Sequence, residues 1–296
     1  MGTAEHSEWS GKTGGRKWMQ QSLVAMFRKC DIRMFYVILV FVVPFYMLFN
    51  RKGYNSIYRY FRERFGYGPV KAFSCVYRNH FVFGQIILDR FATYAGKRYE
   101  VEVVEGQEEF DALSESDGSF MMLSSHIGNY ELAGYTLHSE KKRICALVFG
   151  GETETVMENR NRIFAGSNIT MVPVREDMSH LFEINRALSG GDIVSMPADR
   201  VFGSPKTVEC DFLGKSAKFP SGPFAIAVQR GIPILSIFVM KRSAKRYAAY
   251  IRRIDVPAEG RAIEKRELMA REYVADMERI VRMYPAQWFN YYDFWA

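Results

Sequence analysis

Two titratable side chains stand close together in the segment SSHIGNYELAG, which runs from Ser124 to Gly134. They are His126 and Glu131, five positions apart. A carboxylate beside an imidazole orients the ring and leaves its other nitrogen free as a general base. Residues five apart on one helix point about 140° away from each other, so the two can meet only if His126 precedes the helix and turns back over its end. Gly128 permits that turn. An isolated pair of this kind is also typical of a helix cap or a core hydrogen bond.

The residues around this pair predict a strand, a tight turn and a helix. The apolar residues 120–123 indicate a buried strand that ends at Ser125, and a helix is expected to begin at Asn129, a favourable N-cap residue. This order places His126 at the carboxyl end of a sheet, where open α/β sheets bind ligands. Glu131 then falls in the first helical turn, where negative charge is favoured, and the helix N-terminus opposes protonation of the imidazole.

Other catalytic chemistries lack their signatures in this sequence. There is no G-x-S-x-G elbow and no H-E-x-x-H motif, and the stretch FLGKS has Glu209 where a phosphate loop has its first glycine. The cysteines and the remaining histidines are scattered without metal-ligand spacing: Cys30, Cys75, Cys145, Cys210, His6, His80, His138 and His180. We therefore expect no metal and no cofactor, and a base that activates a substrate hydroxyl or amine directly.

Strand and helix patterns alternate from about residue 100 onward. Strands are expected at 99–104, 119–124, 143–149, 170–174, 193–197, 234–240 and 247–254, and helices at 105–114, 129–139, 153–165, 178–188, 222–230 and 262–283. This alternation predicts the α/β class, with a central, mostly parallel sheet flanked by helices. We expect the α/β part to form the catalytic domain and to cover residues 96–296. A membrane-associated helical region is expected to cover residues 1–95.

The N-terminal region contains an uncharged run, MFYVILVFVVPFYMLF, at residues 34–49. It is slightly shorter than the ~20 residues that span a bilayer, and Pro44 interrupts it. Both flanks are basic, with Lys12, Arg16, Lys17, Arg28, Lys29 and Arg33 before the run and Arg51, Lys52, Arg59, Arg62 and Arg64 after it. Because positive flanks resist translocation, we predict attachment to an anionic cytoplasmic leaflet, either monotopic or with one short tilted span. A fully buried core helix is the alternative.

The overall charge is consistent with an anionic partner. The formal net charge is +7, which suits nucleic acid, anionic lipid or an acidic carrier protein. Three further lysines, Lys206, Lys215 and Lys218, could help to attract an acidic carrier protein. No nucleic-acid-binding signature is present, so nucleic acid is not expected among the partners.

Three blocks of the sequence carry a family resemblance when they are taken together. The first is His-x4-Glu at His126 and Glu131, and the second is NRNRIFAGSNITMVPVRE. The third is SMPADRVFGSPKTVECDFLGKSAKFPSGPFAIAVQRGIPILSIFV, with an acidic then a basic residue, a Phe-Leu-Gly turn, a Gly-Pro helix start and a G-x-P before a strand. The chain thereby resembles the lysophospholipid acyltransferase superfamily, in its branch of bacterial lipid A late (lauroyl/myristoyl) acyltransferases. The resemblance continues to PAQWF near the C-terminus.

The resemblance implies an activity and a set of site residues. The activity is transfer of a fatty acyl chain from an acyl thioester, acyl-carrier protein or acyl-CoA, to a lipid acceptor at the cytoplasmic face of the bacterial inner membrane. His126 would be the general base and Glu131 its partner. The residues expected to bind substrate are Asn129, Arg160, Arg162, Arg175, Asp199, Arg200 and Gly222. Among the arginines, Arg200 is preferred for an acceptor phosphate because it follows Asp199 in the third block, and a guanidinium pairs well with phosphate.

Two departures from the lipid A branch leave the acceptor open. HIGNYE is closer to the loops of related glycolipid acyltransferases, and the ending FNYYDFW lacks an expected arginine. The acceptor is thus either a lipid A precursor or another glycolipid or aminolipid. Two alternatives stand beside acyl transfer: a catalytically idle lipid-binding protein of the same fold, and a thioesterase in which water replaces the acceptor.

Overall fold

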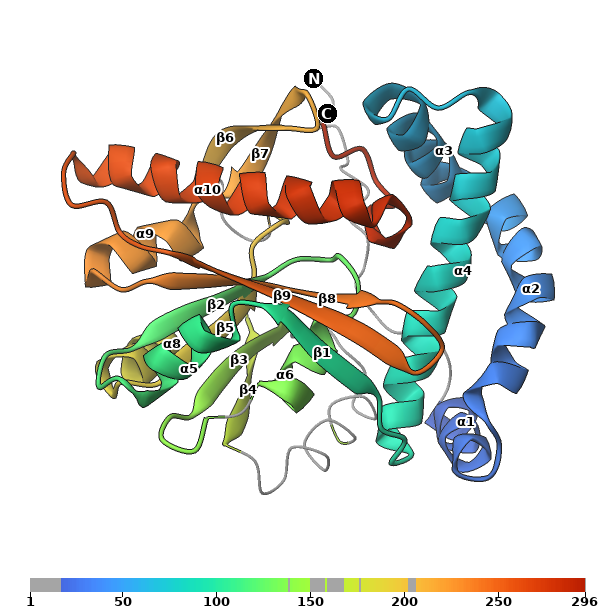
Figure 1. The fold of residues 1–296 in the computed structure, drawn as a ribbon, viewed down its shortest axis with the longest axis horizontal. Coiled ribbons are helices and arrows are strands. Elements are labelled where there is room, and N and C mark those ends of the chain that lie inside the picture. The colour runs from blue at the N-terminus through green and yellow to red at the C-terminus, as the bar shows by residue number, and fades with distance from the viewer. Residues whose placement is uncertain are drawn as a thin grey trace.

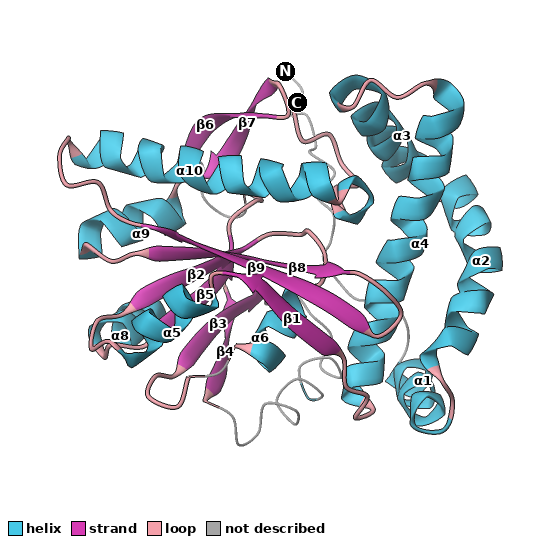
Figure 2. Ribbon diagram, in the orientation of Figure 1, coloured by secondary structure: helices cyan, strands magenta, loops and turns pink. Residues whose placement is uncertain are grey.

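A computed structural model describes residues 17–137, 139–149, 158, 168–175, 177–201 and 206–295. Four N-terminal helices stand beside a central sheet that carries further helices (Figure 1). Figure 2 separates the strands, helices and loops of the same view. The helix expected at residues 153–165 lies outside the described residues.

The central sheet has seven strands in the order β1-β9-β8-β2-β5-β3-β4. Their bounds are β1 (Glu100–Glu105), β2 (Phe120–Ser124), β3 (Ile144–Phe149), β4 (Ile169–Val174), β5 (Ile193–Pro197), β8 (Ile234–Lys241) and β9 (Arg246–Ile254). Neighbouring strands pair in parallel except β8 and β9, which are antiparallel. The predicted α/β class with a mostly parallel sheet is therefore confirmed.

Helices cover both faces of this sheet, as the alternation of side chains along β2 shows. Met121 and Leu123 pack into one hydrophobic cluster, whereas Phe120 and Met122 pack into another on the opposite face. The first face is covered by α8 (His180–Ser189), α9 (Gly222–Arg230) and α10 (Ala262–Met283), and the second by α5 (Gln107–Glu115) and α6 (Ala133–Thr136). A strand buried on both faces has no polar alternation, and β2 is buried at every position.

Along the chain, a two-stranded antiparallel hairpin that is separate from the central sheet follows β5 and precedes α9. It consists of β6 (Thr207–Phe212) and β7 (Lys215–Pro220), joined by Leu213 and Gly214. Both joining residues have positive φ, 52° and 78°, as a two-residue hairpin turn requires. The stretch FLGKS is therefore a strand–turn–strand corner, which agrees with our interpretation that it is no phosphate loop.

The N-terminal helices are α1 (Lys17–Lys29), α2 (Ile32–Phe49), α3 (Arg51–Arg59) and α4 (Pro69–Tyr94), with a π-helical turn at Tyr60–Arg64. The uncharged run forms most of α2, which lies alongside α4 (Figure 1). Leu39 of α2 packs onto Gly84 of α4. One hydrophobic cluster joins Val43 and Ile57 of this region to Met121 of the sheet, so the two parts share a core. The expected division near residue 95 falls in the connection between α4 and β1 and stays a prediction.

Candidate active site

The parallel register of β2 and β5 brings His126 and Asp199 together. Ser124, the last residue of β2, pairs with Pro197, the last residue of β5. The chain continues past the sheet edge on both strands, and the Ala198 N–H donates to the Ser124 carbonyl at 2.8 Å. Two residues beyond each strand end, the side chains of His126 and Asp199 meet.

The Asp199 carboxylate holds both the backbone and the ring of His126. Its Oδ2 accepts the His126 N–H at 2.9 Å, and its Oδ1 lies 2.8 Å from His126 Nδ1. The carboxylate is fully buried, whereas 20% of the imidazole is exposed. Because an ionised carboxylate only accepts hydrogen bonds, Nδ1 carries the proton and Nε2 is the basic nitrogen. The arrangement is an imidazole that a buried carboxylate orients through Nδ1 and that is partly exposed.

The charges around Asp199 keep it ionised. Burial acts to raise the pKa of the Asp199 carboxyl, but His126 and Arg200 together outweigh that effect and hold the pKa below its ordinary value. A carboxylate at this position stabilises the imidazolium that forms when His126 accepts a proton.

Glu131 does not occupy the position that the sequence suggested. Its Oε1 forms an ion pair with Arg90 Nε of α4 at 3.1 Å, and both side chains are mostly buried. The chain after Gly128 forms only a 3-10 turn, Tyr130–Leu132, followed by the short α6, and not the helix expected at 129–139. In this structure Asp199, and not Glu131, bonds to Nδ1, and a catalytic role of Glu131 stays a prediction.

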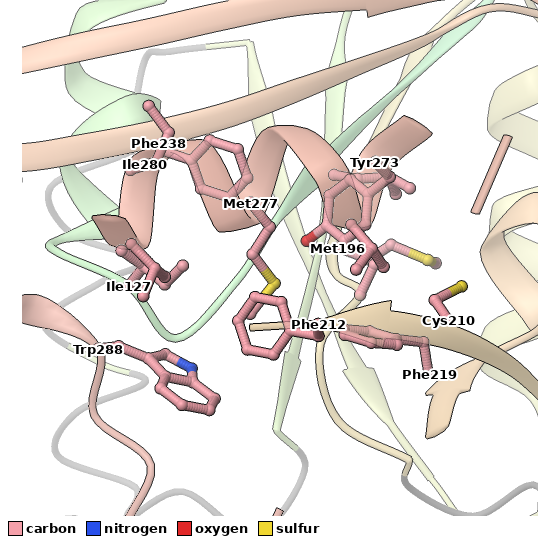
Figure 3. Packing of buried hydrophobic residues seen from close by; sticks show 14 of the residues in the cluster. Ile127, Met196, Cys210, Phe212, Phe219, Phe238, Tyr273, Met277, Ile280 and Trp288 are labelled. Carbon is pink, nitrogen blue, oxygen red and sulfur yellow. The ribbon is translucent and has the colours of Figure 1, made fainter. Parts of the chain in front are cut away.

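The loop that carries His126 is fixed by the sheet on one side and by the C-terminal segment on the other. Ile127 forms a bridge with Trp288, and Gly128 forms one with Val239 of β8. Figure 3 shows Ile127 and Trp288 close together within the buried cluster. Gly128 has a φ of 59°, and a Cβ there would lie 2.1 Å from the Val239 carbonyl oxygen. Only glycine fits that position.

Arg200 lies at the edge of the site and is held by the C-terminal segment. Its Nη2 donates to the Phe289 carbonyl at 3.0 Å, and its guanidinium stacks 5.6 Å from the ring centroid of Tyr292. The Phe289 N–H donates to the His126 carbonyl at 3.1 Å, so the same segment contacts both residues. Tyr130 completes the surroundings, with its ring 5.8 Å from the imidazole.

The remaining predicted site residues are dispersed. Asn129 is buried beside His126, and its N–H donates to the Val239 carbonyl, but its side chain makes no capping hydrogen bond. Arg175 is exposed directly after β4, and Gly222 is exposed at the first turn of α9. No described contact joins either of them to His126. Arg160 and Arg162 lie outside the described residues.

The sequence reasoning missed the contribution of the C-terminal segment to the site. Phe289 and Tyr292 contact His126 and Arg200, yet they stand more than 85 positions away in the chain. The available signal was the resemblance through PAQWF, which includes Phe289. Among the residues that the structure describes, no group of three or more His, Cys, Asp or Glu side chains is placed to hold a metal ion.

A comparison with known proteins gives this geometry its context. A family model for "Bacterial lipid A biosynthesis acyltransferase" matches residues 82–295, which include both His126 and Asp199. The chain belongs to this family. As a lipid A biosynthesis acyltransferase family member, it is an enzyme that transfers acyl groups from an acyl donor to a lipid, and the predicted superfamily is confirmed.

One solved structure is similar in its chain path. The 1-acyl-sn-glycerophosphate (LPA) acyltransferase PlsC from Thermotoga maritima matches 92% of this chain and 99% of its own, with 18% sequence identity and a TM-score of 0.41. No individually curated protein sequence matches this lipid A biosynthesis acyltransferase family member.

Proposed function

We propose that this acyltransferase takes its acyl group from a thioester, either acyl-carrier protein or acyl-CoA, with His126 as the general base. The observation that carries the proposal is the His126–Asp199 pair at the carboxyl edge of the sheet, with Nδ1 bound to a buried carboxylate. A histidine fixed in this way at an accessible edge has its Nε2 available to accept a proton.

The proposed reaction needs one proton transfer in each direction. Nε2 of His126 accepts the proton of the acceptor hydroxyl or amine while the acceptor atom attacks the thioester carbonyl carbon. The tetrahedral intermediate then loses the thiolate as the carbon–sulfur bond breaks, and the imidazolium returns the proton to sulfur. Asp199 stabilises the imidazolium between these steps. The products are an acylated lipid and a free thiol.

Arg200 is the residue that we assign to the acceptor headgroup. The Phe289 carbonyl and the Tyr292 ring hold its guanidinium next to Asp199, and a planar guanidinium forms paired hydrogen bonds with phosphate. Asn129, Arg160, Arg162, Arg175 and Gly222 remain predicted contacts of the substrates. The acceptor is a lipid A precursor or another glycolipid or aminolipid.

We also propose that the exposed face of α2 attaches the enzyme to the cytoplasmic face of the bacterial inner membrane. Large apolar side chains cover this face: Met34, Val37, Ile38, Phe41, Phe45, Leu48 and Phe49. The helix is long and apolar enough to cross a membrane, and 28% of its residues are buried against the protein. Its 18 residues give about 27 Å, short of the ~30 Å hydrocarbon core, and its other face packs on α4. These features favour a helix that lies in the plane of an anionic leaflet.

The function is tested with the variant His126→Ala in a vesicle assay. Palmitoyl-CoA and palmitoyl-acyl-carrier protein serve as donors, vesicles of bacterial membrane lipids supply the acceptor, and free thiol and lipid masses are measured. We expect the variant to lose at least about 10³-fold in turnover, because it lacks the base. The variant His80→Ala is the matched control, since His80 lies in α4 and bonds to the Val76 carbonyl.

Each other outcome of this assay has a definite meaning. Turnover within a few-fold of the parent in His126→Ala would remove His126 from the mechanism. Free fatty acid without an acylated lipid would make the enzyme a thioesterase under these conditions. Absence of thiol release from both donors would leave lipid binding as the function of the fold.

The membrane proposal is tested by placing charges on α2. Phe41 and Phe45 are 68% and 63% exposed, and the double variant Phe41→Glu/Phe45→Glu should reduce sedimentation with vesicles that contain phosphatidylglycerol by at least about tenfold. The matched control is Phe182→Glu, because Phe182 is 79% exposed on α8. Equal sedimentation of the two variants would place the attachment elsewhere.

A further inference from the structure

A second buried charge pair lies outside the active site and joins the N-terminal helices to the sheet. Asp89 of α4 accepts hydrogen bonds from Tyr36 of α2, from Tyr99 before β1, from Tyr247 of β9 and from Lys241 of β8. The side chains of Asp89 and Lys241 are both buried, with exposures of 0% and 4%. This Asp89 cluster links α2, α4, β8 and β9, and Figure 1 shows the turn of the β8–β9 hairpin beside α4.

The polar groups of the Asp89 cluster satisfy one another's hydrogen bonds, so no N–H group of Lys241 is left to bind a ligand. Lys241 directs its three N–H groups at Asp89, at the Tyr36 hydroxyl (3.0 Å) and at the Tyr247 hydroxyl (3.3 Å). A buried ion pair of this kind contributes little net stability compared with apolar residues of the same volume, whereas it defines geometry strongly. The position of the cluster in the fold is therefore informative about its role.

The backbone of Lys241 connects the cluster to the loop of the catalytic histidine. The side chain of Gln287 accepts the Lys241 N–H at 2.9 Å and donates to the Lys241 carbonyl at 2.8 Å. The Gln287 carbonyl in turn accepts the Gly128 N–H at 2.8 Å. Two residues earlier in β8, the Val239 carbonyl accepts the Asn129 N–H at 2.7 Å. Residues 127–129 are thus held between the end of β8 on one side and Gln287 on the other.

A second connection runs through Tyr247. Burial and the neighbouring Asp89 raise the pKa of the Tyr247 hydroxyl. Tyr247 contacts Asp89 and Lys241 Nζ through its hydroxyl, and it lies opposite Lys241 in the register of β8 and β9. Tyr99 contacts the same carboxylate at 3.0 Å from the first strand.

We propose that Asp89, Lys241 and Tyr247 are positioning residues for the acyl transfer: they fix the end of β8, and with it the His126 loop, relative to α2. The proposal rests on the proposed function, because it assigns a role in aiming the imidazole of His126. The cluster itself does not touch the reacting atoms. Since Tyr36 belongs to α2, the same cluster ties the placement of the apolar helix to the placement of the base.

The test compares two variants that each remove one buried hydroxyl from the same carboxylate. Tyr247→Phe removes the hydroxyl that contacts both Asp89 and Lys241 at the end of β8, and Tyr99→Phe removes the one on the β1 side. With palmitoyl-CoA and bacterial lipid vesicles, we expect Tyr247→Phe to lower kcat by about tenfold with an unchanged KM for palmitoyl-CoA, because a displaced base affects the chemical step. Tyr99→Phe should stay within about twofold of the parent in both constants.

Amide hydrogen exchange of the peptide that covers residues 125–130 supplies a readout that requires no activity. Exchange at this peptide should rise at least several-fold in Tyr247→Phe and stay at the parental rate in Tyr99→Phe, with α9 as an internal reference. If both variants melt at similarly lowered temperatures but keep the parental exchange and kcat, the cluster serves stability alone and the proposal is overturned. Full activity of His126→Ala would instead overturn the proposed base, and the exchange result would still decide the positioning role.

Discussion

Two buried aspartates in this enzyme face basic side chains, and they differ in what is left open around the base. Asp199 binds the Nδ1 and the backbone N–H of His126, and 20% of the His126 side chain is exposed. Asp89 binds Lys241, all three of whose N–H groups are used within a closed cluster. The first pair sits at the edge of the sheet, the second between the sheet and the N-terminal helices.

The difference bears on which of the two pairs suits the proposed general base. A general base needs a partner that orients it and a free lone pair that a substrate can reach. His126 has an orienting carboxylate and a partly exposed side chain, whereas Lys241 is enclosed by Tyr36, Tyr247 and Asp89. Both pairs are buried and charged, so exposure is the feature that separates the pair proposed for chemistry from the enclosed one.

The sharpest way to test this contrast is to neutralise each carboxylate near His126 in turn. We expect Asp199→Asn to lower kcat by about 10³-fold or more. The neutral amide cannot stabilise the imidazolium, and its N–H₂ group can donate to Nδ1, which would favour the imidazole tautomer with its proton on Nε2. Glu131→Gln should stay within about tenfold of the parent, since its ion pair is with Arg90. Single-turnover cleavage of palmitoyl-CoA with lipid vesicles measures both.

The ranking of these two variants identifies the orienting carboxylate. A larger loss in Glu131→Gln than in Asp199→Asn would return that role to Glu131 and would mean that the loop rearranges when substrate binds. Melting temperatures of both variants, measured beside the rates, separate lost chemistry from lost fold.

Much of the secondary structure follows from local signals in the sequence. The expected elements at 193–197, 222–230 and 262–283 coincide to the residue with β5, α9 and α10. α9 has Pro223 in its first turn and ends at Gly231, whose φ of 65° is the left-handed conformation of a helix C-cap. Such start and stop signals act over a few residues, so a single sequence contains them.

The partner of His126 depended on strand order, which local signals do not contain. β5 inserts between β2 and β3 in the sheet, and this brings Asp199 to a histidine 73 positions earlier in the chain. Sequence reasoning joined His126 to Glu131, the nearest carboxylate along the chain. Chain proximity did not bring Glu131 to Nδ1 in this structure, because residues 130–136 form two short helical pieces and the Glu131 side chain pairs with α4.

The Asp89 cluster was equally inaccessible to sequence reasoning. Its members come from α2, α4, β8, β9 and the chain before β1, and each alone reads as an ordinary core tyrosine or a surface charge. The family resemblance compensated at the active site because its third block contains Asp199 and Arg200. It gave no comparable indication for Asp89 or Lys241.

The smallest effect that we predict is on acid stability, and it concerns the Asp199 side of the comparison. His126 and Arg200 hold the pKa of Asp199 below its ordinary value against the effect of burial, so the unfolded chain binds this proton more readily than the folded one. The stabilisation is therefore present above about pH 4 and is lost as the pH falls through the lowered pKa. Urea unfolding at pH 7, 5, 4 and 3 should show a steeper loss of unfolding free energy below pH 4 in the parent than in Asp199→Asn. Because all other carboxylates are common to both proteins, the difference in slope isolates this one group. Parallel curves would show that Asp199 has the same pKa in the folded and unfolded states, and that the His126–Asp199 contact is weaker in solution than its 2.8 Å separation implies.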